Sequence, residues 1–426
     1  MASTRRSKKS SGSSVSGSRK ASQDNREEER AQSSVVRFRT SFSNTIYDVM
    51  KGRGWKETDS ETDWDCHWAE RDWVYDVFDN VHLENWQRLN HFRNGRELCR
   101  KDLLVKNLKR RKRQLDREGR ADEAEAYDFF PVTFVLPREY AMFVEEFKRS
   151  GGVWIMKPIG SAQGKGIFLF SRLSEISEWR TDYRYRGGKD QKESEVEAYV
   201  VQRYIANPFT IGGKKFDLRI YVLVTSFSPL QAWLHRSGFA RFSNSRYSSD
   251  PKDIANNFMH LTNVAIQKTA ENYDARSGGK WDIRNLKLYL VSQFGREMVD
   301  ELFWRMQMLI LRSLFSVQHV MINDKHCFEL YGYDVMIDDT LKPWLIEVNA
   351  SPSLSANTKE DYDLKTDMLN DLLDVIDLEG NLKGDEEHVG GFDLIYDNGY
   401  VDMNQDDAGW SSYLGAAINP NKSSGG

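Results

Sequence analysis

The stretch 328–352, FELYGYDVMIDDTLKPWLIEVNASP, predicts two β-strands joined by a tight turn. The first strand carries a lone acid, Asp334, and the second ends in Glu347, Val348 and Asn349. Strand side chains alternate between the two faces of a sheet, so Glu347 and Asn349 point one way and Val348 points toward the core. Oxygen-bearing side chains on neighbouring strands suit a hard cation such as Mg²⁺, which leaves positions open for phosphate and water. This stretch therefore predicts a metal–nucleotide site.

The alternative interpretation of the same stretch is a solvated hairpin edge. Leu345, Ile346 and Val348 surround the acid and favour a buried strand. An acid buried without a partner is costly, so burial favours a functional role for Glu347.

A second strand pair, separated by a polar loop, is predicted over 153–170, VWIMKPIGSAQGKGIFLF. Lys157 ends its first strand, and Gly160, Gly164 and Gly166 let the loop backbone come close to phosphate oxygens. The loop is neither a Walker loop nor a Rossmann fingerprint, because no Ser or Thr follows GKG and no GxGxxG occurs. Alone, such a glycine-rich hairpin is weak support for a phosphate site.

Three further segments strengthen the nucleotide prediction. The strand in 198–209, AYVVQRYIANPF, ends in an irregular segment whose backbone groups can contact an adenine edge. The strand KKFDLRIYVLV places Lys215, Asp217 and Arg219 on one face, where the alternative is an exposed sheet face. The polar residues 260–263, HLTN, can add hydroxyl and amide contacts.

In this order, KP…QGKGIF, QRYI, KFDLR, GFARFS, HLTN and YDV…EVNASP resemble the tubulin tyrosine ligase-like family, and within it the polyglutamylases. The resemblance covers roughly 36–393 and implies an α/β fold with an ATP-grasp catalytic core and small N-terminal and central lobes. It also implies ATP and Mg²⁺ as cofactors.

The resemblance assigns roles to individual residues. Those that would hold the ATP phosphates are Lys157, Gln163 and Gly164. Those that would border the adenine or line the nucleotide pocket are Gln202, Arg203, Tyr204, Ile205, Lys215, Phe216, Asp217, Thr262 and Asn263. The magnesium ligands would be Asp334, Glu347 and Asn349. The cations that would hold the incoming amino acid are Arg241, Lys280 and Lys365. Roles in catalysis itself are expected for Lys157, Arg241 and Glu347.

The activity that the resemblance implies is the addition of free L-glutamate to glutamate side chains of tubulin C-terminal tails through an acylphosphate. A tubulin glycylase or tyrosine ligase would use the same ATP site, but glycine lacks a side-chain carboxylate, so Arg241 together with Lys365 favours glutamate. A non-catalytic microtubule-binding module is a further alternative, which the intact set of acids disfavours. We expect a monomer in the cytoplasm and cytoskeleton, at the axoneme and basal body of a cilium or flagellum, with a ciliary adaptor protein as a partner.

Composition sets the domain plan. The length of 426 residues predicts two or three domains, and the hydrophobic fraction of 39% is enough for a sizeable core. No apolar run approaches the ~20 residues of a membrane span, and three scattered cysteines without zinc spacing favour a reducing compartment. The predicted parts are a disordered basic tail (1–34), an N-terminal lobe (35–131), the start of a central lobe (132–150), the ATP-grasp central and C-terminal catalytic lobes (151–393) and a flexible C-terminal tail (394–426).

The residues 100–120 predict a very basic helix within a chain whose net charge is −4. A polybasic helix attracts polyanions, and nucleic acid is disfavoured because no aromatic residues are interleaved with the basic ones. We therefore predict that Lys109, Arg110, Arg111 and Lys112 contact acidic tubulin tails. The alternative is an ordinary solvated helix face.

Overall fold

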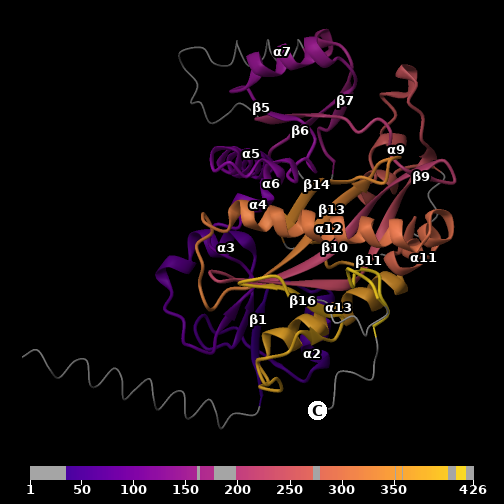
Figure 1. The fold of residues 1–426 in the computed structure, drawn as a ribbon. Coiled ribbons are helices and arrows are strands. Elements are labelled where there is room, and N and C mark those ends of the chain that lie inside the picture. The colour runs from indigo at the N-terminus through magenta and orange to yellow at the C-terminus, as the bar shows by residue number, and fades with distance from the viewer. Residues whose placement is uncertain are drawn as a thin grey trace, which may run out of the picture.

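The computed structural model describes residues 35–160, 164–176, 198–271, 279–350, 352–356, 358–401 and 409–418. The predicted basic tail over 1–34 therefore lies outside the described residues, as does Gln163. The described chain is an α/β protein built on three sheets (Figure 1). No helix within these ranges has the length of apolar sequence that a bilayer crossing needs.

The largest sheet is antiparallel and has the strand order β14-β13-β10-β11-β16-β15, with β9 paired to β10 and β12 paired to β11. Its strands are β9 (Thr210–Ile211), β10 (Lys214–Phe227), β11 (Leu230–Arg246), β12 (Lys280–Asp282), β13 (Glu329–Ile337), β14 (Pro343–Ala350), β15 (His388–Val389) and β16 (Phe392–Asp397). The hairpin predicted from 328–352 is β13 and β14, in which Asp334 pairs with Glu347.

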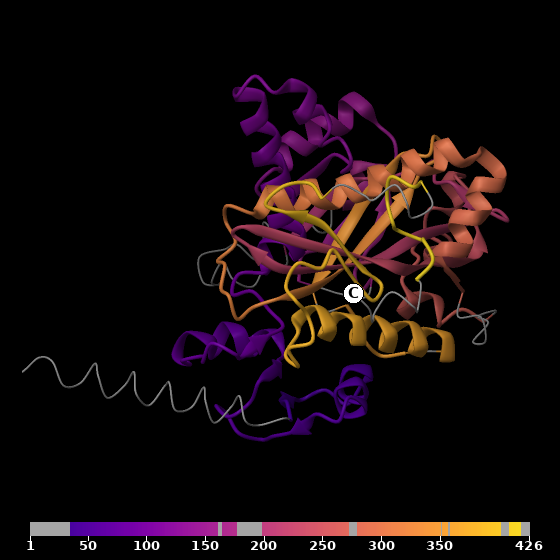
Figure 2. The ribbon, with the colours of Figure 1, turned by 60° about the horizontal axis from the view of Figure 1, so that its bottom comes forward.

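Helices cover both faces of this sheet, as Figure 2 shows. On one face, α11 (Ile283–Phe294) and α12 (Arg296–Val317) pack against Leu218, Ile220 and Val222 of β10. On the other face, α2 (Thr45–Gly52) and α13 (Lys359–Ile376) pack near Tyr221 and Leu223. The alternation along β10 sends Lys215, Asp217 and Arg219 to the α13 side, so they share a face with charged residues of that helix.

Two smaller sheets complete the fold. The central lobe is an antiparallel sheet of order β5-β8-β6-β7, covered by α7 (Tyr140–Ser150) and centred on Phe143 and Trp154. Its strands are β5 (Thr133–Leu136), β6 (Trp154–Pro158), β7 (Phe168–Phe170) and β8 (Tyr199–Arg203). The N-terminal sheet is parallel, with order β2-β1-β3-β4, and its strands are β1 (Arg37–Thr40), β2 (Lys56–Glu57), β3 (Cys66–Trp68) and β4 (Arg88–Leu89).

Short helices connect these sheets. They are α3 (Arg71–Asp76), α4 (Arg96–Cys99), α6 (Ala121–Glu125), α9 (Asn257–His260), α10 (Val264–Gln267) and the 3-10 helices Phe78–Asn80, Leu173–Ile176 and Pro251–Asp253. The predicted basic helix is α5 (Lys101–Arg117), which packs on α4 and α12 through Leu104, Leu108 and Leu115.

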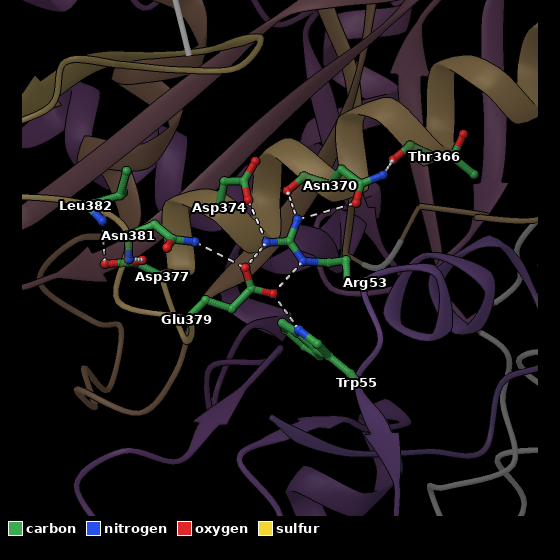
Figure 3. A network of polar contacts seen from close by, with 9 residues as sticks. All are labelled: Arg53, Trp55, Thr366, Asn370, Asp374, Asp377, Glu379, Asn381 and Leu382. Atoms are coloured by element: carbon green, nitrogen blue, oxygen red, sulfur yellow. Dashed lines mark hydrogen bonds and ion pairs between the residues drawn. The ribbon is translucent and has the colours of Figure 1, made fainter. Parts of the chain in front are cut away.

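A polar network fixes the N-terminal lobe to the C-terminal end of α13 (Figure 3). Arg53, just after α2, donates to Asp374 (2.7 Å) and to both oxygens of Glu379 (2.8 and 3.0 Å). The indole nitrogen of Trp55 donates to Glu379 as well (2.6 Å). These contacts join segments more than 300 positions apart in the sequence.

Parts of the segment 394–426, for which a flexible tail is predicted, pack against the large sheet and its helices. Strand β16 continues to Asp397 and pairs with β11, and Tyr413 and Leu414 are buried. Buried Lys287 donates to the carbonyl of Leu414 (2.9 Å) and lies 3.9 Å from the Trp410 ring centre. Backbone and cation–π contacts thus add to the burial of Ile395 and Leu414 in the core, although the segment is rich in Gly, Asn and Asp.

Candidate active site

A cavity of about 820 Å³ lies between the central-lobe sheet and the large sheet. Side chains from β6, β8, β10, β11, β13 and β14 line it, together with the loops around α9 and α13. The predicted site residues that line it are Lys157, Gly164, Gln202, Arg203, Tyr204, Ile205, Lys215, Asp217, Arg241, Thr262, Asn263, Lys280, Asp334, Glu347, Asn349 and Lys365.

Phe216 is the described exception, and its assignment to the nucleotide pocket is corrected. Its side chain is 1% exposed and packs in the core beside Phe209 and Phe242. The cause is strand alternation, which sends Phe216 to the face opposite Lys215 and Asp217.

Two buried lysines occupy the side of the cavity next to the central lobe. Lys157 Nζ donates to Gln202 Oε1 (2.7 Å), and Gln202 Nε2 in turn donates to Thr133 Oγ1 (2.9 Å). Lys215 Nζ donates to the Tyr204 hydroxyl (2.9 Å) and to the carbonyl of His260 (2.7 Å). Burial lowers the pKa of Lys157 to about 8 and that of Lys215 to about 7. A bound anion would therefore stabilise the charged form of both amines.

The glycine-rich loop requires glycine at two of its described positions. Gly164 has a φ of +79° and Gly166 a φ of +71°, in the left-handed region that other residues rarely adopt. A Cβ on Gly164 would also lie 2.5 Å from the side chain of Ile266 in α10. The loop backbone can therefore approach the cavity where a side chain would collide.

The predicted magnesium ligands converge. Asn349 Nδ2 lies 3.3 Å from Glu347 Oε1 and 3.5 Å from Asp334 Oδ2. Burial raises the pKa of Asp334, but the nearby Arg219 and Arg241 outweigh burial and lower this pKa to about 2, so Asp334 is ionised at neutral pH. An ionised carboxylate beside a second carboxylate and an amide fits a hard cation. Among the described residues, no three His, Cys, Asp or Glu side chains gather at one point, so the set depends on the amide of Asn349.

Arg241 lines the cavity, but two carboxylates already bind its guanidinium, so its role as a cation for the incoming amino acid stays a prediction. Its Nε donates to Asp217 Oδ1 (2.9 Å), and its Nη2 pairs with the other Asp217 oxygen and with Asp334 Oδ2 (2.8 Å). Arg219 donates to both carboxylate oxygens of Asp334 (2.6 and 3.3 Å). These contacts also exclude an exposed sheet face for the charged side of β10.

The other two predicted substrate cations meet at one carboxylate. Nζ of Lys280 and Nζ of Lys365 lie 3.0 and 3.1 Å from Oδ2 of Asp361. Lys280 is also the register partner of Arg241, so the three predicted cations are neighbours. Asp361 was not predicted, because nothing in the sequence distinguishes it from the other acids of α13.

The N-terminal lobe adds four cations to the cavity wall that sequence reasoning missed. They are Arg71, Arg96, Arg100 and Lys101, from α3, α4 and the start of α5. The sequence signal for two of these cations was the pair Arg100 and Lys101 at the start of the basic helix.

The cavity carries many lysine and arginine side chains beside one compact group of carboxylates, a lining that suits anionic ligands in an α/β protein. A comparison with protein families matches residues 80–383 to the Tubulin-tyrosine ligase family. The chain belongs to this family.

Curated relatives match most of the chain. The "Probable tubulin polyglutamylase TTLL9" of Rattus norvegicus is 49% identical over 399 residues, which cover 88% of this chain and 86% of the relative. The "Probable tubulin polyglutamylase ttll-9" of Caenorhabditis elegans is 48% identical and covers 85% of each chain. The "Probable alpha-tubulin polyglutamylase Ttll1" of Tetrahymena thermophila is 42% identical, over 86% of this chain and 94% of the relative.

Proposed function

We propose that this protein is an ATP-dependent ligase that adds glutamate through isopeptide bonds to glutamate side chains of tubulin C-terminal tails. The observation that carries the proposal is the convergence of Lys157, Lys215, Asp334, Glu347 and Asn349 on one cavity in a chain 49% identical to a protein named as a probable tubulin polyglutamylase. By the same reasoning, we place the enzyme on microtubules, in particular those of cilia or flagella.

The chemistry assigns the two lobes different tasks. A carboxylate is a poor electrophile at neutral pH, so ATP would phosphorylate the acceptor glutamate to an acylphosphate, which the glutamate amine then attacks with release of phosphate. In an ATP-grasp arrangement, the central lobe and the large sheet would hold the nucleotide between them. Lys157 and Lys215 would supply positive charge beside the phosphates, where negative charge grows in the transition state.

Magnesium would be held by Asp334, Glu347 and Asn349, and when bound it would neutralise phosphate charge and orient in-line transfer. Asp334 is already paired with Arg219 and Arg241. Glu347 forms no ion pair with another described residue, so its charge would face the cation most directly. No side-chain nucleophile is needed for this sequence of steps.

The direct test is to incubate the purified protein with microtubules, ATP and isotope-labelled glutamate, and to examine the tubulin tails by mass spectrometry. We expect mass additions of glutamate on tail glutamates. Parallel incubations with glycine and with tyrosine separate the glycylase and tyrosine ligase alternatives. Binding to microtubules without any mass addition would leave only the non-catalytic module.

ATP binding is expected to take up protons at about pH 8. In the free enzyme the pKa values of Lys215 and Lys157 are lowered to about 7 and about 8, so both amines are partly neutral there. A triphosphate stabilises the charged amines and raises both pKa values, so affinity for ATP should rise as the pH falls from about 9 to about 7. Calorimetry in buffers of different ionisation enthalpy measures the uptake, and an equal heat in all buffers would contradict it.

The residues chosen from the basic helix need revision before they are tested on microtubules. Lys109 pairs with Glu139 (3.1 Å), Arg110 donates to the carbonyl of Ser316 (3.1 Å), and Arg111 donates to Gln114 (3.2 Å). Neutralising Lys109 and Arg110 would remove contacts of α5 with other elements as well as its charge, and Lys112, the fourth residue of the predicted set, is only partly exposed. The exposed cations of α5 are instead Lys106, Arg113 and Arg117. Their spacing places them on the same helix face as Arg110.

Replacing Lys106, Arg113 and Arg117 with Gln should weaken microtubule association. Exposed charge pairs contribute about 0.5 kcal/mol each, so the loss should be roughly tenfold at low salt, and it should shrink as salt rises. Co-sedimentation over a salt series measures it. The matched control changes the exposed Lys56, Lys148 and Lys252 to Gln. Equal binding by both triple variants would return α5 to an ordinary solvated helix.

A further inference from the structure

Asp361 is a buried carboxylate that belongs to no predicted ligand set. It stands in the first turn of α13, where its amide donates to the N-cap side chain of Thr358 (3.2 Å). Its Oδ2 contacts Lys280 Nζ at 3.0 Å and Lys365 Nζ at 3.1 Å. One carboxylate oxygen therefore holds together two ammonium groups, one from β12 and one from the next turn of α13.

We propose that Asp361 is a positioning residue that holds Lys280 and Lys365 as a two-ammonium receptor for one carboxylate of the incoming amino acid. This inference rests on the proposed function, because it takes glutamate as the amino acid. The resemblance to the family already assigns the two lysines to the amino acid, and the new element is Asp361, which holds them together.

The placement of the three side chains separates those that face the substrate from the one behind them. Lys280 and Lys365 line the 820 Å³ cavity, whereas Asp361 does not. Asp361 lines a neighbouring groove of about 650 Å³ on the other side of Lys280. The two lysines thus face the substrate cavity, and the Asp361 carboxylate contacts them from the side of the neighbouring groove.

The charge balance on this sheet face favours one more carboxylate at the lysines. In the ion pairs around Arg241 and Asp361, the cations are Arg219, Arg241, Lys280 and Lys365, and the acids are Asp217, Asp334 and Asp361. The two arginines are bound by Asp217 and Asp334, so the excess positive charge lies on the lysine pair. An anionic substrate group is the natural counterion for it.

Other contacts fix both lysines in place. Lys365 donates to the carbonyl of Ser355 (2.6 Å), and Lys280 Nζ lies 4.5 Å from the ring centre of Phe239. Without Asp361, two ammonium groups this close would repel each other and separate or lose a proton. Asp361 therefore sets both the spacing and the charge of the pair.

The test is Asp361→Asn, with Asp363→Asn as the matched control, because Asp363 is exposed on the same turn of α13. We expect KM for glutamate to rise about tenfold in Asp361→Asn, with KM for ATP nearly unchanged. The control should match the wild type. Equal increases for ATP and glutamate with a lower Tm, or no increase for glutamate, would overturn the proposal.

Two substrate analogues identify the carboxylate that is held. Glutamine lacks the side-chain carboxylate, and glutamate α-amide lacks the α-carboxylate. Asp361→Asn should reduce the preference for glutamate over one analogue about tenfold and leave the other preference unchanged. A merely structural role would leave both preferences as they are, and that result would count against the proposal.

Equilibrium binding keeps this proposal separate from the tubulin assignment. Labelled glutamate should bind wild type in the presence of a non-hydrolysable ATP analogue, and more weakly to Asp361→Asn. If wild type binds glutamate in this way but modifies no tubulin, the tubulin proposal fails and the receptor stands. If Asp361→Asn does not fold, Asp361→Glu keeps the charge and should retain most binding; an unchanged affinity in a folded Asp361→Ala would overturn the receptor.

Discussion

Glu347→Gln should abolish glutamate transfer while the protein stays folded. Glu347 is half-buried, and its Oε1 accepts from Asn349 Nδ2 at 3.3 Å, so the glutamine amide fits in the same space. A neutral amide is a weaker ligand for Mg²⁺ than a carboxylate. We expect transfer to fall at least about a hundredfold, or roughly 2.7 kcal/mol of transition-state free energy.

Transfer of labelled glutamate across a magnesium series measures this effect, and thermal unfolding checks the fold. Partial recovery at high magnesium would mark a weakened metal site. The control is Glu145→Gln, the same substitution at an exposed position of α7. Activity near that of the wild type would show that the metal ligands lie elsewhere.

Arg241→Ala should lower the stability of the protein and damage the use of ATP and glutamate together. The guanidinium is 7% exposed and binds both Asp217 and Asp334. Its removal leaves two buried carboxylates without their shared cation, a loss of about 3–5 kcal/mol in the free energy of unfolding. A role of Arg241 as a direct cation for the amino acid would instead give a selective loss for glutamate with unchanged melting.

Denaturant unfolding together with KM values for both substrates separates the two outcomes. Arg241→Lys is an informative companion, because it keeps the charge but loses the planar fork that fits Asp217. We expect it to fall between wild type and Arg241→Ala in stability. Normal stability of Arg241→Ala with a selectively raised glutamate requirement would restore Arg241 as a direct substrate contact.

The site residues could be predicted where chemistry and strand period agree. Asp334, Glu347 and Asn349 could be predicted because polar side chains on a buried strand are costly unless they bind a partner. Lys157 and Lys215 were found in the same way, as lone charges at the end or on one face of apolar strands. These positions need only local sequence and the two-residue alternation of a strand.

The remaining features depend on contacts that local sequence does not encode. The capture of Arg241 by Asp217 follows from the register of β10 with β11, which shifts at three points along the pair. Asp361 contacts Lys280 only when α13 lies beside β12 in the folded protein. The contacts of α5 with Glu139 and Ser316 likewise require the folded central lobe and α12. Phe216 is different, since strict alternation already excluded it.

The joining of β10 to β13, which pairs Arg219 with Asp334 across 115 positions, has a consequence for the newly made chain. Ribosomes extend a polypeptide by about 5–20 residues each second, from the N-terminus onward. The β5-β8-β6-β7 sheet can therefore fold early, but the proposed magnesium ligands are complete only after β14 and the proposed lysine receptor only after α13. No nascent chain that stops before Lys365 can carry all of the proposed site residues, so the site is completed only after α13 has been synthesised.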